Sequence, residues 1–400
     1  MKVSVLPRLL FVFKLTEGLL DDAETMKMAG ILVCQHKTTL QDSGVTAVPV
    51  SQRSCWTVVS FWMKVLLFII FTPAFLNYAS LQREGQVLSA AGAQLIDIGL
   101  GQKIHLLCKG HGRPVVVLDA PAGISSDVWY YVQEGLSLST KVCTYDRVGL
   151  GFSRRTLQNE TTGTEKVWGI STTGRMVDDL HRLVRVADIA TPFILIGSEL
   201  GTLNGRFYSH IHDTQVSDLV LIDPIPEDVF EEEKWQQYWY SHLVPSLQMM
   251  QFSAAAGLSR LLIILGVLKP LFQGGDVSEE LIQRQKYLLC NPAHQSAAVD
   301  EHFFLNESAS QVREISRYKP LSSKTSVHVI TGESFDYQLP SDLNQVVAEL
   351  QSKFLERSYP SANHIQIPGA DRHMIYKNPS LLIKHLHKLV SQRQSNQQKQ

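Results

Sequence analysis

The sequence predicts an α/β fold in which a mostly parallel β-sheet is covered by helices. From about residue 90, short runs of aliphatic and β-branched residues alternate with segments of helical spacing, the pattern of strands joined by crossover helices. Some of these runs, such as 115–119 and 219–223, are apolar nearly throughout, which is typical of strands buried on both faces. The chain should therefore contain one large α/β domain.

The amino-acid composition of the chain indicates which partners and cofactors to expect. The 400 residues are 44% hydrophobic, and 37 Lys and Arg nearly balance 38 Asp and Glu. Such a chain is globular and has no basic stripe for a phosphate backbone, so we expect no nucleic-acid partner. The five cysteines lack metal-ligand spacing and no glycine-rich phosphate loop occurs, so we expect neither a metal nor a cofactor.

The first eighty residues contain a candidate membrane span. Residues 58–79 are mostly apolar with Lys64 as their one charge, and tryptophan and tyrosine flank them, as suits the two interfaces of a bilayer. We predict a poorly structured segment at 1–55 and a single membrane anchor at 56–79. A signal-peptide core beginning at Val65 and a buried core helix are the alternatives.

Charge and sequons orient this anchor. Basic residues before the span outnumber those just after it, which places the N-terminus in the cytosol and the large domain in the lumen or outside the cell. Asn159 and Asn306 begin glycosylation sequons. Cys108 and Cys143 lie in strands that could be neighbours, where they would be either a disulfide in an oxidising compartment or two buried thiols.

Local sequence patterns predict the individual strands and helices of the domain. We predict strands at 94–99, 103–108, 115–119, 141–146, 193–198, 219–223, 327–330 and 364–367 from their β-branched and aliphatic runs. We predict helices at 127–136, 174–187, 203–212 and 379–390 from their helical spacing. The remaining polar residues, 392–400, should form a frayed tail.

The strand at 193–198 runs into a glycine-bracketed turn with the outline G-x-S-x-G. In that motif a sharp strand-to-helix turn exposes a nucleophile at its third place. Counted from Gly197, the third place holds Glu199. Ser198 stands one place early, and a register centred on it would need glycines at 196 and 200, where the chain has isoleucine and leucine.

Three segments show a family resemblance. They are Val116-Val117-Leu118-Asp119, Cys143-Thr144-Tyr145-Asp146-Arg147-Val148-Gly149-Leu150-Gly151-Phe152-Ser153 and Leu219-Val220-Leu221-Ile222-Asp223-Pro224. With them, residues 93–391 resemble the α/β-hydrolase superfamily, and most of all its members with a Tyr-Asp-Arg-x-Gly-x-Gly-x-Ser loop. The resemblance implies a mostly parallel eight-stranded sheet with a helical cap. The core would occupy 90–228 and 323–391, and the cap 229–322.

The resemblance also implies catalytic roles. Glu199 takes the place of the nucleophile, and His373 matches the family histidine that follows the last strand. Asp336 fits the acid that orients this histidine, although its spacing is one residue longer than the commonest form, so Glu333 and Asp223 remain alternatives. Relatives with aspartate at the nucleophile position open epoxides or dehalogenate substrates through an ester intermediate.

The oxyanion hole departs from the family pattern as well. One donor should be the backbone N–H of Leu200. The other should come from the position of Pro121, which has no N–H, so Ala122 would have to substitute. A longer nucleophile and a missing donor together favour a non-catalytic or weakly active protein. An active ester or epoxide hydrolase using Glu199, Asp336 and His373 is the alternative, and a site based on Ser198 is the least favoured.

The insertion between the strands at 219–223 and 327–330 points to a hydrophobic ligand. It opens with clustered aromatic residues and contains the apolar stretch 257–270. This stretch predicts either a cap helix packed on the core or a lid that touches the membrane. We expect a hydrophobic small molecule or lipid in the pocket, the membrane as a contact surface, and room for a protein partner.

Overall fold

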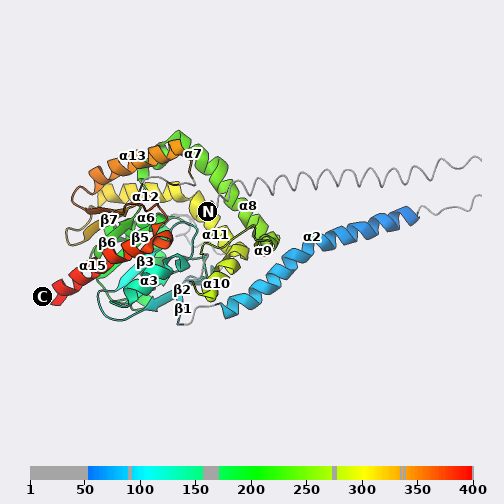
Figure 1. The fold of residues 1–400 in the computed structure, drawn as a ribbon, viewed down its shortest axis with the longest axis horizontal. Coiled ribbons are helices and arrows are strands. Elements are labelled where there is room, and N and C mark those ends of the chain that lie inside the picture. Colours follow the sequence, from blue (N-terminus) through cyan, green and yellow to red (C-terminus); the bar gives the residue numbers. More distant parts are fainter. Residues whose placement is uncertain are drawn as a thin grey trace, which may run out of the picture.

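A computed structural model describes residues 53–88, 92–155, 171–272, 277–333, 336 and 339–398. Most of the segment 1–55 and the sequon at Asn159 lie outside these residues. The described chain forms one α/β domain from which a long helix projects (Figure 1).

Eight strands form one sheet in the order β1-β2-β4-β3-β5-β6-β7-β8. β1 pairs with β2 and β2 with β4 in antiparallel fashion, whereas all other neighbours are parallel. The α/β prediction with a mostly parallel eight-stranded sheet is therefore confirmed. The strands are β1 (Gln94–Gly99), β2 (Gln102–Lys109), β3 (Val116–Asp119), β4 (Val142–Tyr145), β5 (Phe193–Ser198), β6 (Val216–Ile222), β7 (Ser326–Thr331) and β8 (Asn363–Gln366).

Helices cover both faces of this sheet. β3, β5 and β6 are buried at every residue, and their side chains alternate between two hydrophobic cores. Helices α5 (Thr173–Val186), α6 (Leu200–Ile211) and α13 (Ser341–Ser358) pack on one face. On the other face lie α3 (Tyr130–Ser137), α14 (Met374–Lys377) and α15 (Pro379–Gln398). Because both faces of these central strands are buried, their sequences are continuous apolar runs.

The segment between β6 and β7 is helical, where the cap was predicted. It comprises η2 (Glu227–Glu231), α7 (Glu233–Tyr238), η3 (Trp239–Leu243), α8 (Val244–Ala255), α9 (Leu258–Ile264), α10 (Glu279–Cys290), α11 (Pro292–Phe303) and α12 (Leu305–Tyr318). α12 packs against α5 and α6. The aromatic cluster at the start of this segment is folded inward, since Trp235 and Trp239 are buried.

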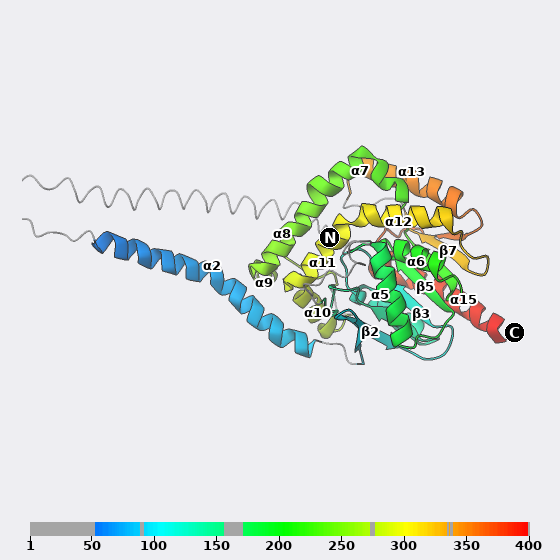
Figure 2. The same ribbon diagram turned by 180° about the vertical axis from the view of Figure 1, so that it is seen from behind.

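Helix α2 (Arg53–Val87) contains the predicted membrane span and extends beyond both of its predicted ends. Within it, Thr57–Val87 is long and apolar enough to cross a bilayer, with a mean hydropathy of 2.0 in its most apolar window and none of that window buried. Figures 1 and 2 show α2 leaving the domain beside α9 and α10.

The C-terminal end corrects one prediction. α15 continues to Gln398 instead of ending at 390, so the expected frayed tail is helical as far as this residue. Arg393 explains the difference: its guanidinium lies 2.7 Å from Asp218 of β6 and also donates to the Ser217 carbonyl. An ion pair and its hydrogen bonds hold this last part of the helix against the sheet.

Cys108 and Cys143 occupy directly paired positions of β2 and β4. They form a disulfide with a Cα–Cα distance of 4.0 Å. Of the two readings that the sequence allowed, the bridge is the one found. Such a bridge is typical of proteins from oxidising compartments.

Candidate functional site

The elbow geometry is preserved around Glu199. This residue joins β5 to α6 with φ 48° and ψ −111°, a conformation that residues with a side chain rarely adopt. A Cβ atom on Gly197 would collide with the Gly201 carbonyl, and one on Gly201 would collide with the Asp119 carbonyl. The two glycines therefore permit the tight turn, and Glu199 occupies the position where a nucleophile would stand.

Ser198 lies on the other side of this turn. It is the last residue of β5 and is fully buried, whereas Glu199 is half-buried and lines a cavity. Because Ser198 does not line this cavity, a site based on its hydroxyl is not supported by the geometry.

Asp336 and His373 are brought together. Nε2 of His373 lies 3.6 Å from Oδ2 of Asp336, and both residues line the same cavity as Glu199. The two alternative acids are occupied elsewhere. Asp223 pairs with Arg372 at 2.6 Å, and Glu333 accepts the Gly369 N–H at 2.9 Å. Asp336 is thus the candidate acid that faces this histidine.

The two predicted oxyanion donors flank Glu199. Leu200 is the first residue of α6, where a backbone N–H has no partner within the helix. Pro121 and Ala122 both line the cavity. Pro121 contributes no N–H, and its carbonyl accepts from Arg147 at 2.7 Å. Ala122 is the remaining source of a second donor.

A buried ion network supports this loop, and the sequence did not reveal it. Arg147 binds Glu301 through two hydrogen bonds of 2.7 Å and Asp119 through one of 2.6 Å. Glu301 also accepts the Gly123 N–H at 2.7 Å. Although burial acts to lower it, the carboxylates of Glu301 and Asp119 hold the pKa of Arg147 above its ordinary value. The loop at 120–123, which follows β3, is therefore tied to helix α11 of the insertion.

Arg147 stood within the loop that carried the resemblance, so its motif was a usable signal. No sequence signal pointed to Glu301, because this residue lies in a part of the long insertion without a recognisable motif. Only the packing of α11 over the loops that follow β3 and β4 brings the two side chains together.

The cavity above Glu199 has a volume of about 220 Å³ and mostly apolar walls. Its apolar lining includes Ile225, Val229, Phe230, Trp235, Trp239, Leu243, Leu305 and Val347. Polar groups reach it from the core and from the insertion, namely Glu199, Tyr238, His302, Asp336, Arg372, His373 and Tyr376. An apolar cavity with a few convergent polar groups is typical of a site for a small hydrophobic molecule.

Several of these groups have a defined protonation state. Burial is the main cause that raises the pKa of Tyr238 and of Tyr376, so both phenols stay protonated. Burial likewise lowers the pKa of His302. Its Nδ1 lies 2.7 Å from the Ala298 carbonyl; a carbonyl only accepts, so this nitrogen carries the hydrogen.

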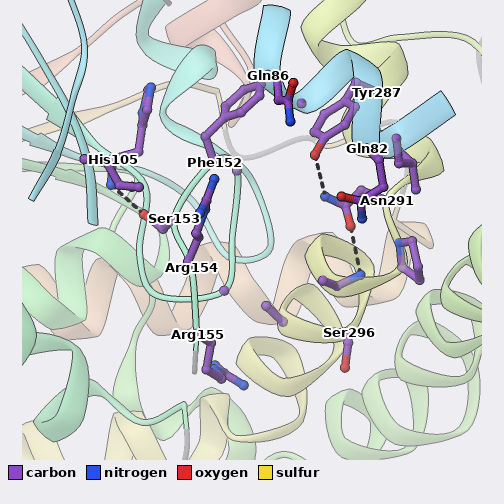
Figure 3. A pocket seen from close by; sticks show the side chains of 18 of the residues that line it. Gln82, Gln86, His105, Phe152, Ser153, Arg154, Arg155, Tyr287, Asn291 and Ser296 are labelled. Carbon is purple, nitrogen blue, oxygen red and sulfur yellow. Dashed lines mark hydrogen bonds between the residues drawn. The ribbon is translucent and has the colours of Figure 1, made fainter. Parts of the chain in front are cut away.

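A second, larger hollow of about 920 Å³ lies where α2 meets the domain. Figure 3 shows its wall of polar side chains, with Gln82 and Gln86 of α2 facing Tyr287 and Asn291 of the insertion. The rings of Phe152 and Tyr287 are stacked, with their centroids 5.4 Å apart. None of the predicted site residues lines this hollow.

Sequence comparison agrees with this architecture. A family model described as "alpha/beta hydrolase fold" matches residues 111–244, which contain the loop of Arg147 and the elbow. The chain has the α/β-hydrolase fold.

Known proteins resemble this α/β-hydrolase-like chain only distantly. The "Probable transporter efuK" of Hormonema carpetanum is 28% identical over 153 residues, covering 36% of this chain and 21% of that protein. The chain thus matches about a fifth of this relative's length. The Cif epoxide hydrolase of Acinetobacter nosocomialis has a TM-score of 0.55 at 16% identity, over 78% of this chain and 95% of that one. A "putative lipase" of Acinetobacter baumannii AYE has a TM-score of 0.54 at 15% identity, over 80% and 97%.

Proposed function

We propose that this protein is a slow, membrane-anchored hydrolase that opens a hydrophobic epoxide with a carboxylate nucleophile. The observation that carries the proposal is the strained backbone of Glu199, which faces the same cavity as the His373–Asp336 pair. Strain of this kind costs about 1–3 kcal/mol and is typical of functional positions. A purely structural carboxylate would not need the elbow.

The first step is an attack on carbon. A carboxylate oxygen of Glu199 attacks a ring carbon of the epoxide, the C–O bond breaks, and the freed oxygen takes a proton from Tyr238 or Tyr376. The product is a glutamyl ester. The two tyrosines suit this step because both are protonated and both line the cavity.

The second step is hydrolysis of that ester. His373 takes a proton from a water molecule, and the water oxygen attacks the carbonyl carbon of the glutamyl ester. Asp336 stabilises the charged imidazole of His373. The Leu200 N–H faces the developing oxyanion. The substrate oxygen then leaves with the proton from His373, and the proton that remains on Glu199 returns to the tyrosine. One epoxide and one water thus yield one diol.

Two features make this enzyme slow. Glutamate is one methylene longer than the aspartate of related carboxylate enzymes, and a misplacement of about 1 Å can cost about a hundredfold in rate. Pro121 removes one oxyanion donor, which costs about 10²–10³. An ester substrate fits less well, because attack by a carboxylate on an acyl carbon would give a reactive anhydride.

The second candidate function is ligand binding without turnover. Pro121 favours it, because this residue lies at the cavity with no N–H to offer. The same apolar walls would then hold a hydrophobic molecule or lipid, or complete a surface for a protein partner.

We place the N-terminus in the cytosol and the α/β domain in the lumen or outside the cell, with α2 as a single span. The disulfide between Cys108 and Cys143 supports an oxidising compartment. Asn306, which begins the second glycosylation sequon, lies at the start of α12 and is half-buried.

The test uses the full chain in detergent with a panel of long-chain terminal epoxides. We expect diol formation, and a covalent adduct on the peptide that contains Glu199, detected by mass spectrometry. His373→Asn should trap this adduct, since water is no longer activated. Glu199→Gln and Glu199→Ala should abolish both adduct and diol.

Ser198→Ala is the matched control, because this neighbouring side chain is buried in the core and its loss should leave diol formation intact. If the epoxides bind without any adduct or diol, the hydrolase proposal is wrong and the binding function stands. A Ser198→Ala variant without activity would contradict the assignment of Glu199.

A further inference from the structure

The corner between α8 and α9 exposes an unusual amount of apolar surface. Ile264 and Leu265 are 74% and 73% exposed. Other large apolar side chains of this corner are exposed by 38–64%, namely Met249, Phe252, Leu258, Leu261, Val267 and Leu271. A contiguous apolar patch of this kind marks an interaction surface.

The corner is docked on α2 by specific contacts. Gly257 lies between α8 and α9 with φ 75°, and a Cβ atom there would collide with the Pro73 carbonyl. The Asn77 side chain is 2% exposed and donates to the carbonyls of Ala254 and Cys290 at 3.0 Å each. A polar side chain within an apolar span needs such partners. The position of α9 along α2 is thus defined.

That position places the corner at the depth of the bilayer. Pro73 precedes Ala79, the last residue of the predicted span, by six residues, which is about 9 Å along a helix. Farther out, Arg260 of α9 pairs with Glu84 at 2.8 Å, beyond the end of the span. The polar contacts therefore lie toward the headgroups, and the Gly257–Pro73 contact lies inside the apolar zone.

We propose that the α8–α9 corner is embedded in the lipid bilayer beside α2, in the leaflet next to the domain. The inference rests on the proposed membrane anchoring of α2. Its apolar side chains would contact acyl chains, while Arg260 and Lys269 near the ends of the stretch lie at headgroup level. The occupant of this surface is thus lipid.

The embedded corner gives the cavity access to the membrane. η3 continues directly into α8, and its residues Trp239 and Leu243 line the cavity above Glu199. One helical segment thus runs from the cavity wall to the lipid. A substrate dissolved in the bilayer could enter beside it without crossing water.

The experiment measures lipid contact at single positions of the full chain. Ile264→Cys would be labelled with an environment-sensitive fluorophore, in a background with Cys34→Ser and Cys55→Ser, and reconstituted in phosphatidylcholine vesicles. Some of these vesicles carry a nitroxide on the acyl chain near the headgroup. We expect a roughly twofold or larger loss of emission in the nitroxide vesicles, because the label lies among acyl chains.

Two matched positions make the result decisive. Phe68→Cys, 73% exposed on α2, reports on the anchor, and Tyr318→Cys, 82% exposed at the end of α12, reports on a surface that should stay in water. Quenching at Ile264 and Phe68 but not at Tyr318 supports the proposal. Quenching at Phe68 alone overturns it and leaves the anchor intact. Quenching at Ile264 without Phe68 contradicts the span and therefore overturns a corner embedded beside it, and quenching at neither refutes both.

Discussion

At the scale of single residues, the site combines a preserved backbone with altered chemistry. Glu199 has the strained backbone of the turn between β5 and α6, and the glycines on both sides permit it. The change from a hydroxyl to a carboxylate alters what can be attacked, since a carboxylate suits an electrophilic carbon. Position 199 therefore points to a different substrate class as much as to lost activity.

Pro121 provides a direct test of the missing donor. Pro121→Ala restores a backbone N–H at the cavity, and one oxyanion donor is worth about 10²–10³ in rate. We expect the glutamyl ester to hydrolyse at least about tenfold faster, measured as decay of the adduct in a single turnover. Pro226→Ala, also at the cavity wall, should leave the decay unchanged. Equal decay in both variants would mean that position 121 does not face the oxyanion.

At the scale of elements, the insertion and the core depend on each other through α11. Glu301 of this helix closes the ion network with Arg147 and also holds the Gly123 N–H. The loop at 120–123 is therefore positioned by a helix that is distant in sequence. Any movement of α11 would therefore displace the loop beside Glu199.

Removal of this acid should destabilise the protein. Glu301→Ala removes one of the two carboxylate partners of the buried Arg147 guanidinium and the acceptor of the Gly123 N–H, and breaking a buried ion pair costs about 3–5 kcal/mol. We expect a clear fall in the urea midpoint measured by tryptophan fluorescence. Glu314→Ala removes an exposed pair with Arg317, for which about 0–1 kcal/mol is expected. Similar midpoints for the two variants would show that the buried network contributes little.

At the scale of the whole molecule, the histidines make stability depend on pH. Burial lowers the pKa of His294 from 6.5 to about 4, against the opposing charges of Asp146 and Glu301. Its Nδ1 accepts the Gly151 N–H at 3.0 Å, so the neutral ring is part of the fold. The unfolded chain then binds more protons than the native protein between pH 6.5 and 4. Stability is lost as the pH falls through this window.

The variant His294→Asn should separate this effect from the others. The amide oxygen can still accept from Gly151 but does not titrate, so the decline in the free energy of unfolding from pH 6.5 to 4, measured by urea titration, should become shallower, by up to about 3 kcal/mol. His111→Asn, at an exposed position, should keep the original slope. An unchanged slope in the His294 variant would contradict the assignment.

Much of the architecture could be predicted from local patterns. The apolar runs of β3, β5 and β6 identified buried parallel strands, because two-sided burial leaves no polar alternation to read. The glycines around Glu199 and the loop of Arg147 identified the fold, since both depend on short stretches of backbone. The end of α15 was missed because Arg393 is held by Asp218, a partner 175 residues away in sequence.

The sequence by itself determined the fold class, the apolar span and the residue at the elbow, since each depends on neighbours along the chain. Only the tertiary structure decided which of three acids faces His373, which side chain Glu301 pairs with, and where α9 packs along α2. These depend on pairs of side chains brought together by packing, and no local pattern records such distances.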